Sequence, residues 1–333
     1  MKTLVIMAMS VVMSVVISAV LSACHHDKNE QTLNISHITP EFFTEGALLQ
    51  EATLVTCTLS DGTVTTCYEL VVTGVPSNHD MGPYCPDTIY DDGSDSGIWF
   101  DDSHESVYPL TGEFIKNLAT FYDDDFWQLY DIDSGEVNVT RSAESCQAAI
   151  KATTDEYYNY CIQCEMEDTF NALNSEGGIS VTFLIPTKPV ELSGSEFDSV
   201  YTGSEFLGLA LNGVALSIPA PFDRILSAYT IAAFDPCAAH INPNEGYHYH
   251  GVTECMAKVE QVDGHASLIG FLLDGYGLYD EFNSQGEAAT DLDECNGHTD
   301  ALRGYHYHAQ STQSNEFIGC FHGAQGTAEY TGQ

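Results

Sequence analysis

Two copies of the tetrapeptide Tyr-His-Tyr-His are the part of this sequence best suited to chemistry. They occur as GYHYHG at 246–251 and GYHYHA at 304–309, and together hold four of the chain's 13 histidines. Side chains at positions i and i+2 of a strand point to the same face. We therefore expect His248 and His250 to project together, and likewise His306 and His308, with the tyrosines between them on the opposite face.

Each copy belongs to a longer repeated unit that contains one more histidine. The pattern is Asp-x-Cys-x-x-His, then seven residues, then His-Tyr-His, and each matching position recurs 58 residues later. Upstream, GLALNGVAL at 208–216 resembles GFLLDGYGL at 270–278, so the duplication extends beyond the motif. The repeated positions are Asp235, Cys237, His240, His248 and His250 in the first copy, and Asp293, Cys295, His298, His306 and His308 in the second.

Three imidazoles brought together in this way are a typical ligand set for a transition metal with one open coordination position. We predict metal binding by His240, His248 and His250 and by His298, His306 and His308, at two sites or at one shared site. Copper, zinc and iron all accept imidazole ligands. The alternatives are histidines that only pack against tyrosines, and general acid–base chemistry without a metal.

Metal-bound imidazoles are usually oriented by a hydrogen-bond partner that does not bind the metal itself. Asp235 and Asp293 are candidates for this role because they precede the ligand histidines, and His79 and His265 are further candidates from outside the motifs. His322 follows Cys320 and is a candidate of the same kind.

An acidic turn provides a weak candidate for calcium. Asp131-Ile132-Asp133-Ser134-Gly135 resembles the start of a calcium loop, but Ser142 stands where an EF-hand loop needs Glu. A solvated acidic turn is the alternative interpretation.

The N-terminus has the features of an export signal. Lys2 precedes an apolar run from Leu4 to Leu21, and the run ends in Leu-Ser-Ala-Cys. This pattern predicts a lipoprotein signal peptide over residues 1–23 and a lipid anchor on Cys24. An ordinary signal peptide and a transmembrane anchor are the alternatives.

Eleven cysteines become ten when Cys24 is set aside, and an exported chain with an even number is typically disulfide-bonded. Cys161 and Cys164 form a C-x-x-C without a thioredoxin-like context, so we expect structural disulfides there. The other predicted pairs are Cys57 with Cys67 across a hairpin, Cys237 with Cys255, and Cys295 with Cys320.

Short apolar runs between Gly, Pro, Asn and Asp predict a fold that is mainly β with a few helices, as a β-sandwich or barrel-like module containing an internal duplication. Helices are expected at 112–122 and 142–174, the second capped by Ser142. We assign residues 24–50 to a tether, 51–195 to a β-rich part with a helical insertion and 196–325 to the duplicated module, or 51–325 to one module.

The charge balance excludes nucleic acid as a partner. The chain has 49 Asp and Glu against 9 Lys and Arg, which gives a formal net charge of −40. Such a surface repels polyanions and attracts cations and basic partners. Solubility in a salty environment is an alternative reason for the acidic surface.

The repeated motifs resemble the YHYH-domain family of exported bacterial proteins. The stretches that carry the resemblance are DPCAAHINPNEGYHYH, SLIGFLLDGYGLYD and DLDECNGHTDALRGYHYH, with VTFLIPTKPV and residues from about 52 onward also similar. The resemblance implies one extended module and metal binding, and it implies no particular reaction.

We conclude from the sequence that this is an exported cell-envelope lipoprotein that binds transition-metal ions. A metal-dependent hydrolase or oxidase is the first alternative, with Asp274, Asp293 and Glu294 as general-base candidates. A structural surface protein with histidines that bind no metal is the second.

Overall fold

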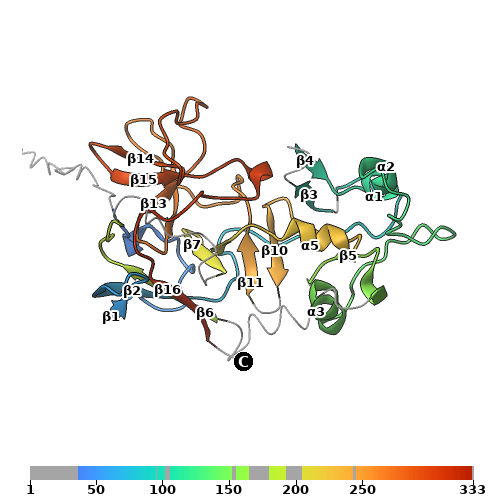
Figure 1. The fold of residues 1–333 in the computed structure, drawn as a ribbon, viewed down its shortest axis with the longest axis horizontal. Coiled ribbons are helices and arrows are strands. Elements are labelled where there is room, and N and C mark those ends of the chain that lie inside the picture. The colour runs from blue at the N-terminus through green and yellow to red at the C-terminus, as the bar shows by residue number, and fades with distance from the viewer. Residues whose placement is uncertain are drawn as a thin grey trace, which may run out of the picture. The chain divides into compact units, whose positions relative to one another are not determined.

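The two repeats form the two halves of one eight-stranded sheet. In the computed structural model, which describes residues 37–94, 96–101, 106–151, 155–164, 180–192, 205–242 and 245–331, the strand order is β10-β11-β8-β7-β12-β13-β15-β14 (Figure 1). From the edge inward, β10, β11, β8 and β7 of one half correspond to β14, β15, β13 and β12 of the other. This correspondence confirms the internal duplication. The strands are β7 (Phe206–Ala210), β8 (Ala215–Ser217), β10 (Ala239–Asn242), β11 (Gly246–Tyr249), β12 (Leu268–Leu272), β13 (Gly277–Tyr279), β14 (Gly297–Asp300) and β15 (Gly304–His308).

Strand pairing is the same in both halves. β7 and β8 are antiparallel, β8 runs parallel to β11, and β11 is antiparallel to β10. β12, β13, β15 and β14 repeat these pairings, and β7 joins β12 in the middle of the sheet. Because β10 and β14 are its edges, this sheet does not close, and the barrel-like alternative from the sequence is wrong.

A tight turn joins the first two strands of each half of the sheet. Asn212-Gly213 joins β7 to β8 and Asp274-Gly275 joins β12 to β13, with φ of 84° and 90° at the two glycines. An added Cβ at Gly213 would lie 2.3 Å from the Ala47 carbonyl oxygen, so glycine is required by both conformation and space.

A second sheet packs with the first around a common core. It has the order β1-β2-β6-β16, and its Val72, Phe183 and Ile185 share one hydrophobic cluster with Phe206 and Phe271 of the large sheet. Two sheets with a shared core agree with the sandwich alternative. The strands are β1 (Thr53–Thr58), β2 (Val64–Val72), β6 (Ser180–Pro186) and β16 (Thr327–Thr331), and β1 with β2 forms the predicted hairpin.

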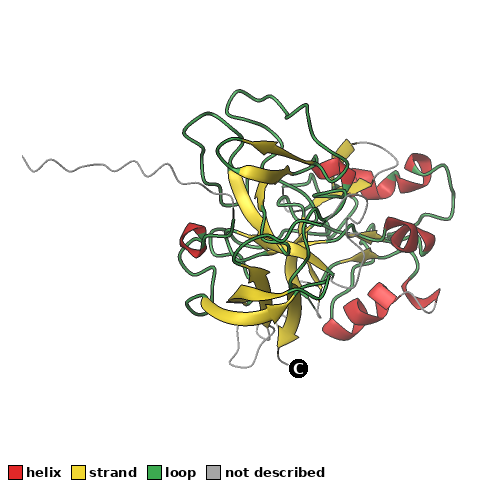
Figure 2. Ribbon diagram, turned by 60° about the vertical axis from the view of Figure 1, so that its left-hand side comes forward, coloured by secondary structure: helices red, strands yellow, loops and turns green. Residues whose placement is uncertain are grey.

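The α-helices gather at one side of the molecule, and α1 (Gly112–Lys116), α2 (Leu118–Phe121) and α5 (Phe222–Ser227) contribute to a second, aromatic core (Figure 2). Trp99, Phe100 and Phe234 are fully buried there. This part also contains α3 (Ala143–Lys151), β3 (Ile98–Asp101), β4 (Ser106–Pro109), β5 (Cys161–Ile162) and β9 (Ile231–Ala232). Short 3-10 turns occupy Pro40–Phe42, Asp155–Tyr157 and Thr312–Ser314.

The predicted helix at 112–122 is confirmed as two short helices, α1 and α2. The helix predicted at 142–174 is wrong in length. The Ser145 N–H donates to the Ser142 hydroxyl at 3.1 Å, which confirms the cap, but α3 ends at Lys151 and Cys161 already lies in a strand. Residues 165–179 lie outside the described part.

The predicted tether is also too long. Ile38 and Ala47 are 2% and 4% exposed, and the Thr44 N–H donates to the Leu211 carbonyl, so residues 37–50 pack on the fold. The apolar side chains in this mainly polar stretch explain the packing. Residues 1–23 and Cys24 lie outside the described part. None of the described helices is long and apolar enough to cross a membrane.

Candidate metal centres

Strand register brings the predicted ligands together in each half. His240 lies opposite His248 in the β10–β11 pair, and His298 lies opposite His306 in the β14–β15 pair. The alternation predicted from the sequence places Tyr247 on the other side of its strand, where its hydroxyl donates to the Asp235 carboxylate at 2.6 Å. The two halves therefore make two separate groups of histidines.

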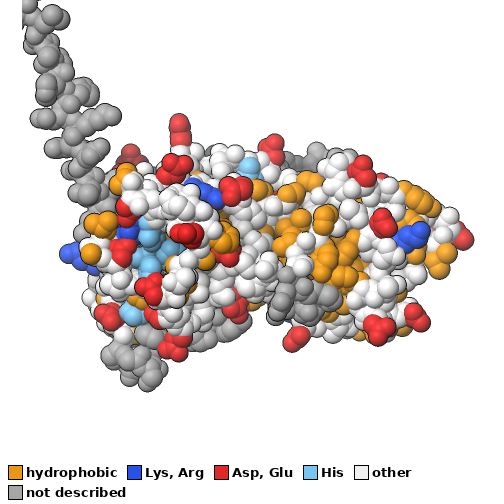
Figure 3. All heavy atoms as spheres, turned by 90° about the horizontal axis from the view of Figure 1, so that it is seen from above, with side chains coloured by type: hydrophobic (Ala, Val, Ile, Leu, Met, Phe, Trp, Pro, Cys, Tyr) orange, Lys and Arg blue, Asp and Glu red, His pale blue; other side chains and the backbone are white. Residues whose placement is uncertain are grey.

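Four histidines form what we call the C-terminal cluster: His265, His298, His306 and His308. The Nε2 atom of His306 lies 2.9 Å from that of His298 and 3.0 Å from that of His265, and His308 Nε2 lies 3.2 Å from His298 Nε2. Figure 3 shows histidine side chains gathered on the surface beside acidic ones.

In the C-terminal cluster, the contact made by Nδ1 of each ring determines which nitrogen carries the proton. The Nδ1 atoms of His265, His306 and His308 lie 3.0–3.1 Å from the carbonyl oxygens of Ala266, Gly304 and Asp280 respectively. A carbonyl only accepts, so each Nδ1 carries the proton and each neutral ring presents a bare Nε2 lone pair to the cluster. His298 Nδ1 lies 3.0 Å from a carboxylate oxygen of Asp291, which accepts the Nδ1 proton, and its Nε2 faces the cluster.

Four converging lone pairs repel one another unless a cation lies among them. Their contacts are close to the spacing of roughly 3.3 Å expected between nitrogens around a tetrahedral metal with bonds of about 2.0 Å. Burial lowers the pKa of His306 to about 3 and of His308 to about 4, so both rings are neutral at pH 7. The donor set thus fits a transition metal.

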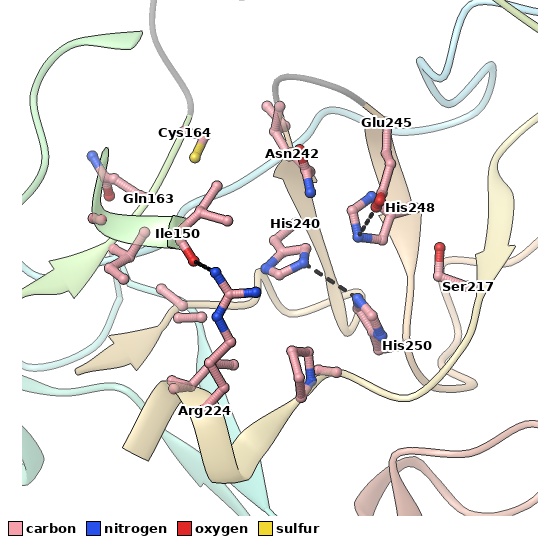
Figure 4. A pocket seen from close by; sticks show the side chains of 18 of the residues that line it. Ile150, Gln163, Cys164, Ser217, Arg224, His240, Asn242, Glu245, His248 and His250 are labelled. Carbon is pink, nitrogen blue, oxygen red and sulfur yellow. Dashed lines mark hydrogen bonds and ion pairs between the residues drawn. The ribbon is translucent and has the colours of Figure 1, made fainter. Parts of the chain in front are cut away.

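Three histidines form what we call the N-terminal cluster: His240, His248 and His250. His250 Nε2 lies 3.2 Å from His240 Nε2 (Figure 4). His248 Nδ1 is held by the Gly246 carbonyl at 3.0 Å. Burial lowers the pKa of His248 to about 4 and holds the pKa values of His240 and His250 well below their ordinary value. This cluster also presents neutral imidazoles.

A carboxyl pair borders the N-terminal cluster. Glu245 Oε2 lies 3.4 Å from His248 Nε2. Burial, together with a hydrogen bond to Glu205, raises the pKa of Glu245 to about 9. Glu245 therefore keeps its proton at neutral pH.

The N-terminal cluster faces a cavity of about 620 Å³. Its wall is mainly apolar, with Ile150, Ile162, Ile225 and Ile241 among the lining residues, and Arg224 is its basic residue (Figure 4). The C-terminal cluster opens on a smaller hollow of about 410 Å³, whose lining includes Asp263, Glu287, Asp291 and Asp300.

Two predicted orienting residues lie elsewhere. Among the described residues, Asp235 and Asp293 form no hydrogen bond with a clustered histidine. Each accepts N–H groups of its own turn and a tyrosine hydroxyl. Their place before the ligands in sequence reflects turn formation by Asp. Backbone carbonyls and Asp291 orient the rings instead.

The three histidines predicted to orient the ligands from outside the motifs lie in different places. His265 lies within the C-terminal cluster rather than outside it. His79 hydrogen-bonds the Tyr249 hydroxyl at 2.8 Å and lies 3.8 Å from Cys237 Sγ, away from both clusters. His322 stacks on Tyr305, with ring centroids 3.7 Å apart.

The acidic candidates do not face a cluster either. Asp274 is fully buried and accepts the Tyr307 hydroxyl, and burial raises its pKa to about 7. Glu294 is exposed. The Asp131 carboxylate accepts the backbone N–H groups of Asp133 and Ser134, which is an acidic turn.

One disulfide in each half closes the loop that carries the repeated histidines. Cys237–Cys255 and Cys295–Cys320 close loops that contain the repeated histidines, and Cys57–Cys67 joins the first hairpin, as predicted. The C-x-x-C residues bond elsewhere, in Cys85–Cys161 and Cys146–Cys164, and are structural as expected. Since the sulfurs near His79 are oxidised, they offer no thiolate to a metal.

Comparison with known proteins agrees with the family resemblance. Residues 182–291 match the family model described as YHYH protein, which confirms the resemblance for this part of the chain. The matched range contains the first YHYH copy and ends before the second. No curated protein and no solved structure matches the chain.

Proposed function

We propose that this chain is an exported lipoprotein that binds transition-metal ions at both histidine clusters. One observation carries the proposal: the Nε2 lone pairs of His298, His306 and His308 converge while their Nδ1 atoms are held by acceptors. Histidines that only packed would have no reason to point their unprotonated nitrogens at one another. Zinc, copper and iron all suit this donor set.

The disulfides and the N-terminal sequence support the cellular context. Five disulfides among the described residues suit an oxidising compartment. The Leu-Ser-Ala-Cys sequence supports lipid attachment at Cys24. We expect Cys24→Ala to move the protein from the membrane fraction to the soluble fraction; an unchanged distribution would contradict the anchor.

Metal content is the primary test. The full chain, purified in a non-ionic detergent and reconstituted with zinc, copper(II) or iron(II), should bind two equivalents of metal by elemental mass spectrometry. His298→Ala/His306→Ala and His240→Ala/His250→Ala should each bind one. His322→Ala removes a histidine outside both clusters and should still bind two.

Near-ultraviolet circular dichroism of each variant separates loss of a ligand from loss of the fold. A folded wild-type chain that takes up none of the three metals would overturn the proposal. So would equal metal loss in His322→Ala and in the cluster variants.

A further inference from the structure

The two clusters differ in the number of ligands that the protein supplies. The C-terminal cluster has four histidines, which complete a tetrahedral site. Among the described residues the N-terminal cluster has three. A metal held by His240, His248 and His250 therefore has a coordination position available to another molecule.

That position adjoins a cavity large enough for a small organic ligand. Its volume of about 620 Å³ falls within the usual range of roughly 300–1,000 Å³ for ligand pockets. Ile150, Ile162 and Ile225 contribute apolar wall, and the histidines and Glu245 contribute the polar part. The hollow beside the C-terminal cluster is smaller, at about 410 Å³, and is lined in part by carboxylates.

Arg224 gives the cavity a positive group in a strongly acidic chain. Its guanidinium donates to the Ile150 carbonyl at 2.8 Å and points toward His240 (Figure 4). In the part of the chain that the structure describes, no carboxylate is within ion-pair distance of Arg224. Since Arg offers several N–H donors in a planar fork, further donors remain for an anion.

The acidic side chain that borders the cluster lies at its other side. Glu245 contacts His248, on the side away from Arg224 in Figure 4. An anionic group is therefore favoured beside Arg224 and His240. A carboxylate suits this single guanidinium, because the two oxygens of a carboxylate match the planar fork of its N–H donors.

We propose that the N-terminal cluster binds a small monocarboxylate with an apolar body. The carboxylate binds Arg224 and the metal, and the apolar body occupies the wall formed by Ile150, Ile162 and Ile225. This inference rests on the proposed metal binding, and its test distinguishes the two.

Cobalt(II) reports on the site because its visible absorption changes when a ligand enters its coordination sphere. The full chain with His298→Ala/His306→Ala, which leaves only the N-terminal cluster, is loaded with cobalt and titrated with hexanoate. Hexanol is the matched control, with the same apolar body and no charge. Hexanoate should change the cobalt spectrum saturably, and hexanol should not.

Arg224→Gln in the same background should weaken hexanoate binding by about tenfold to a hundredfold, because a charged hydrogen bond is lost. Arg224→Lys keeps the charge, so its affinity for hexanoate should lie between those of the Arg224 protein and Arg224→Gln. Circular dichroism and the cobalt content confirm that each variant is folded and loaded.

The outcomes separate the two proposals. A chain that binds no cobalt in this background overturns both. Cobalt binding without a hexanoate response overturns only the monocarboxylate site, as does an equal response to hexanol or an unchanged affinity in Arg224→Gln.

Discussion

Asp291 offers a direct test of how the C-terminal cluster is held for metal binding. Its carboxylate accepts the Nδ1–H of His298 at 3.0 Å, which keeps the opposite nitrogen free for a metal. Loss of such a partner typically weakens metal binding 10–100-fold. Because the Asp291 side chain is 78% exposed, water replaces part of its effect, and we expect Asp291→Ala to weaken binding by about tenfold.

The assay is competition for zinc against a coloured chelator. It uses the full chain with His240→Ala/His250→Ala, so that only the C-terminal cluster takes up metal. Asp291→Asn retains an acceptor oxygen and should lose less affinity than Asp291→Ala. Glu287→Ala removes an equal charge from the same hollow without removing a partner of a clustered histidine.

Equal losses in Asp291→Ala and Glu287→Ala would refute the reasoning, since the effect would then come from charge alone. Unchanged zinc affinity in Asp291→Ala would refute it as well. In either case the orientation of His298 would have to come from packing.

Three further predictions concern stability and the two faces of the strands. In the metal-free protein, burial lowers the pKa of His306 to about 3 and of His308 to about 4, from the ordinary value of 6.5. As the pH falls below 6.5, these histidines therefore bind protons in the unfolded chain but not in the folded chain. Relative to a His306→Gln/His308→Gln variant, stability in urea should therefore fall by roughly 2 kcal/mol per histidine from pH 7 to pH 5, and parallel pH profiles would contradict this. Cys295→Ser/Cys320→Ser opens a loop with a sequence separation of 25 and should destabilise the fold by about 3.5 kcal/mol in the same assay; a loss under about 1 kcal/mol would contradict the loop-closure argument. Tyr247→Phe removes a hydrogen bond to a buried carboxylate and should cost about 1–3 kcal/mol while metal content stays at two equivalents; reduced content would show that the faces are coupled.

Much of the candidate site follows from local sequence rules. Strand alternation separates His248 and His250 from Tyr247 and Tyr249, and the repeated spacing identifies His240 as their partner across the hairpin. The first rule acts within one strand and the second compares two parts of the same chain, so one sequence is enough to apply them.

Other parts depend on pairing between distant segments. His265 enters the C-terminal cluster because β12, β13 and β15 are neighbours, and no spacing within the motif indicates this. The cavity beside His240 likewise combines α5 with residues near Cys164. The closure of a sheet is also decided by long-range pairing, which is why the sequence left a barrel and a sandwich open.

Asp235 and Asp293 show a different limit. The sequence indicates correctly that these two residues repeat, but repetition does not distinguish a turn-forming carboxylate from one that orients an imidazole. Their short-range bonds to backbone N–H groups are typical of Asp in turns, and this ordinary role accounts for their repetition.

The antiparallel pairing of β7 with β12 bears on how such a protein arises. A single half of the sheet, on its own, would expose β7 as an open edge, and two copies would associate through that edge as a symmetric dimer. A dimer of identical chains must carry identical metal centres. Joining the halves in one gene removes this constraint, so that one cluster can gain His265 while the other has three histidines among the described residues and a ligand-sized cavity nearby.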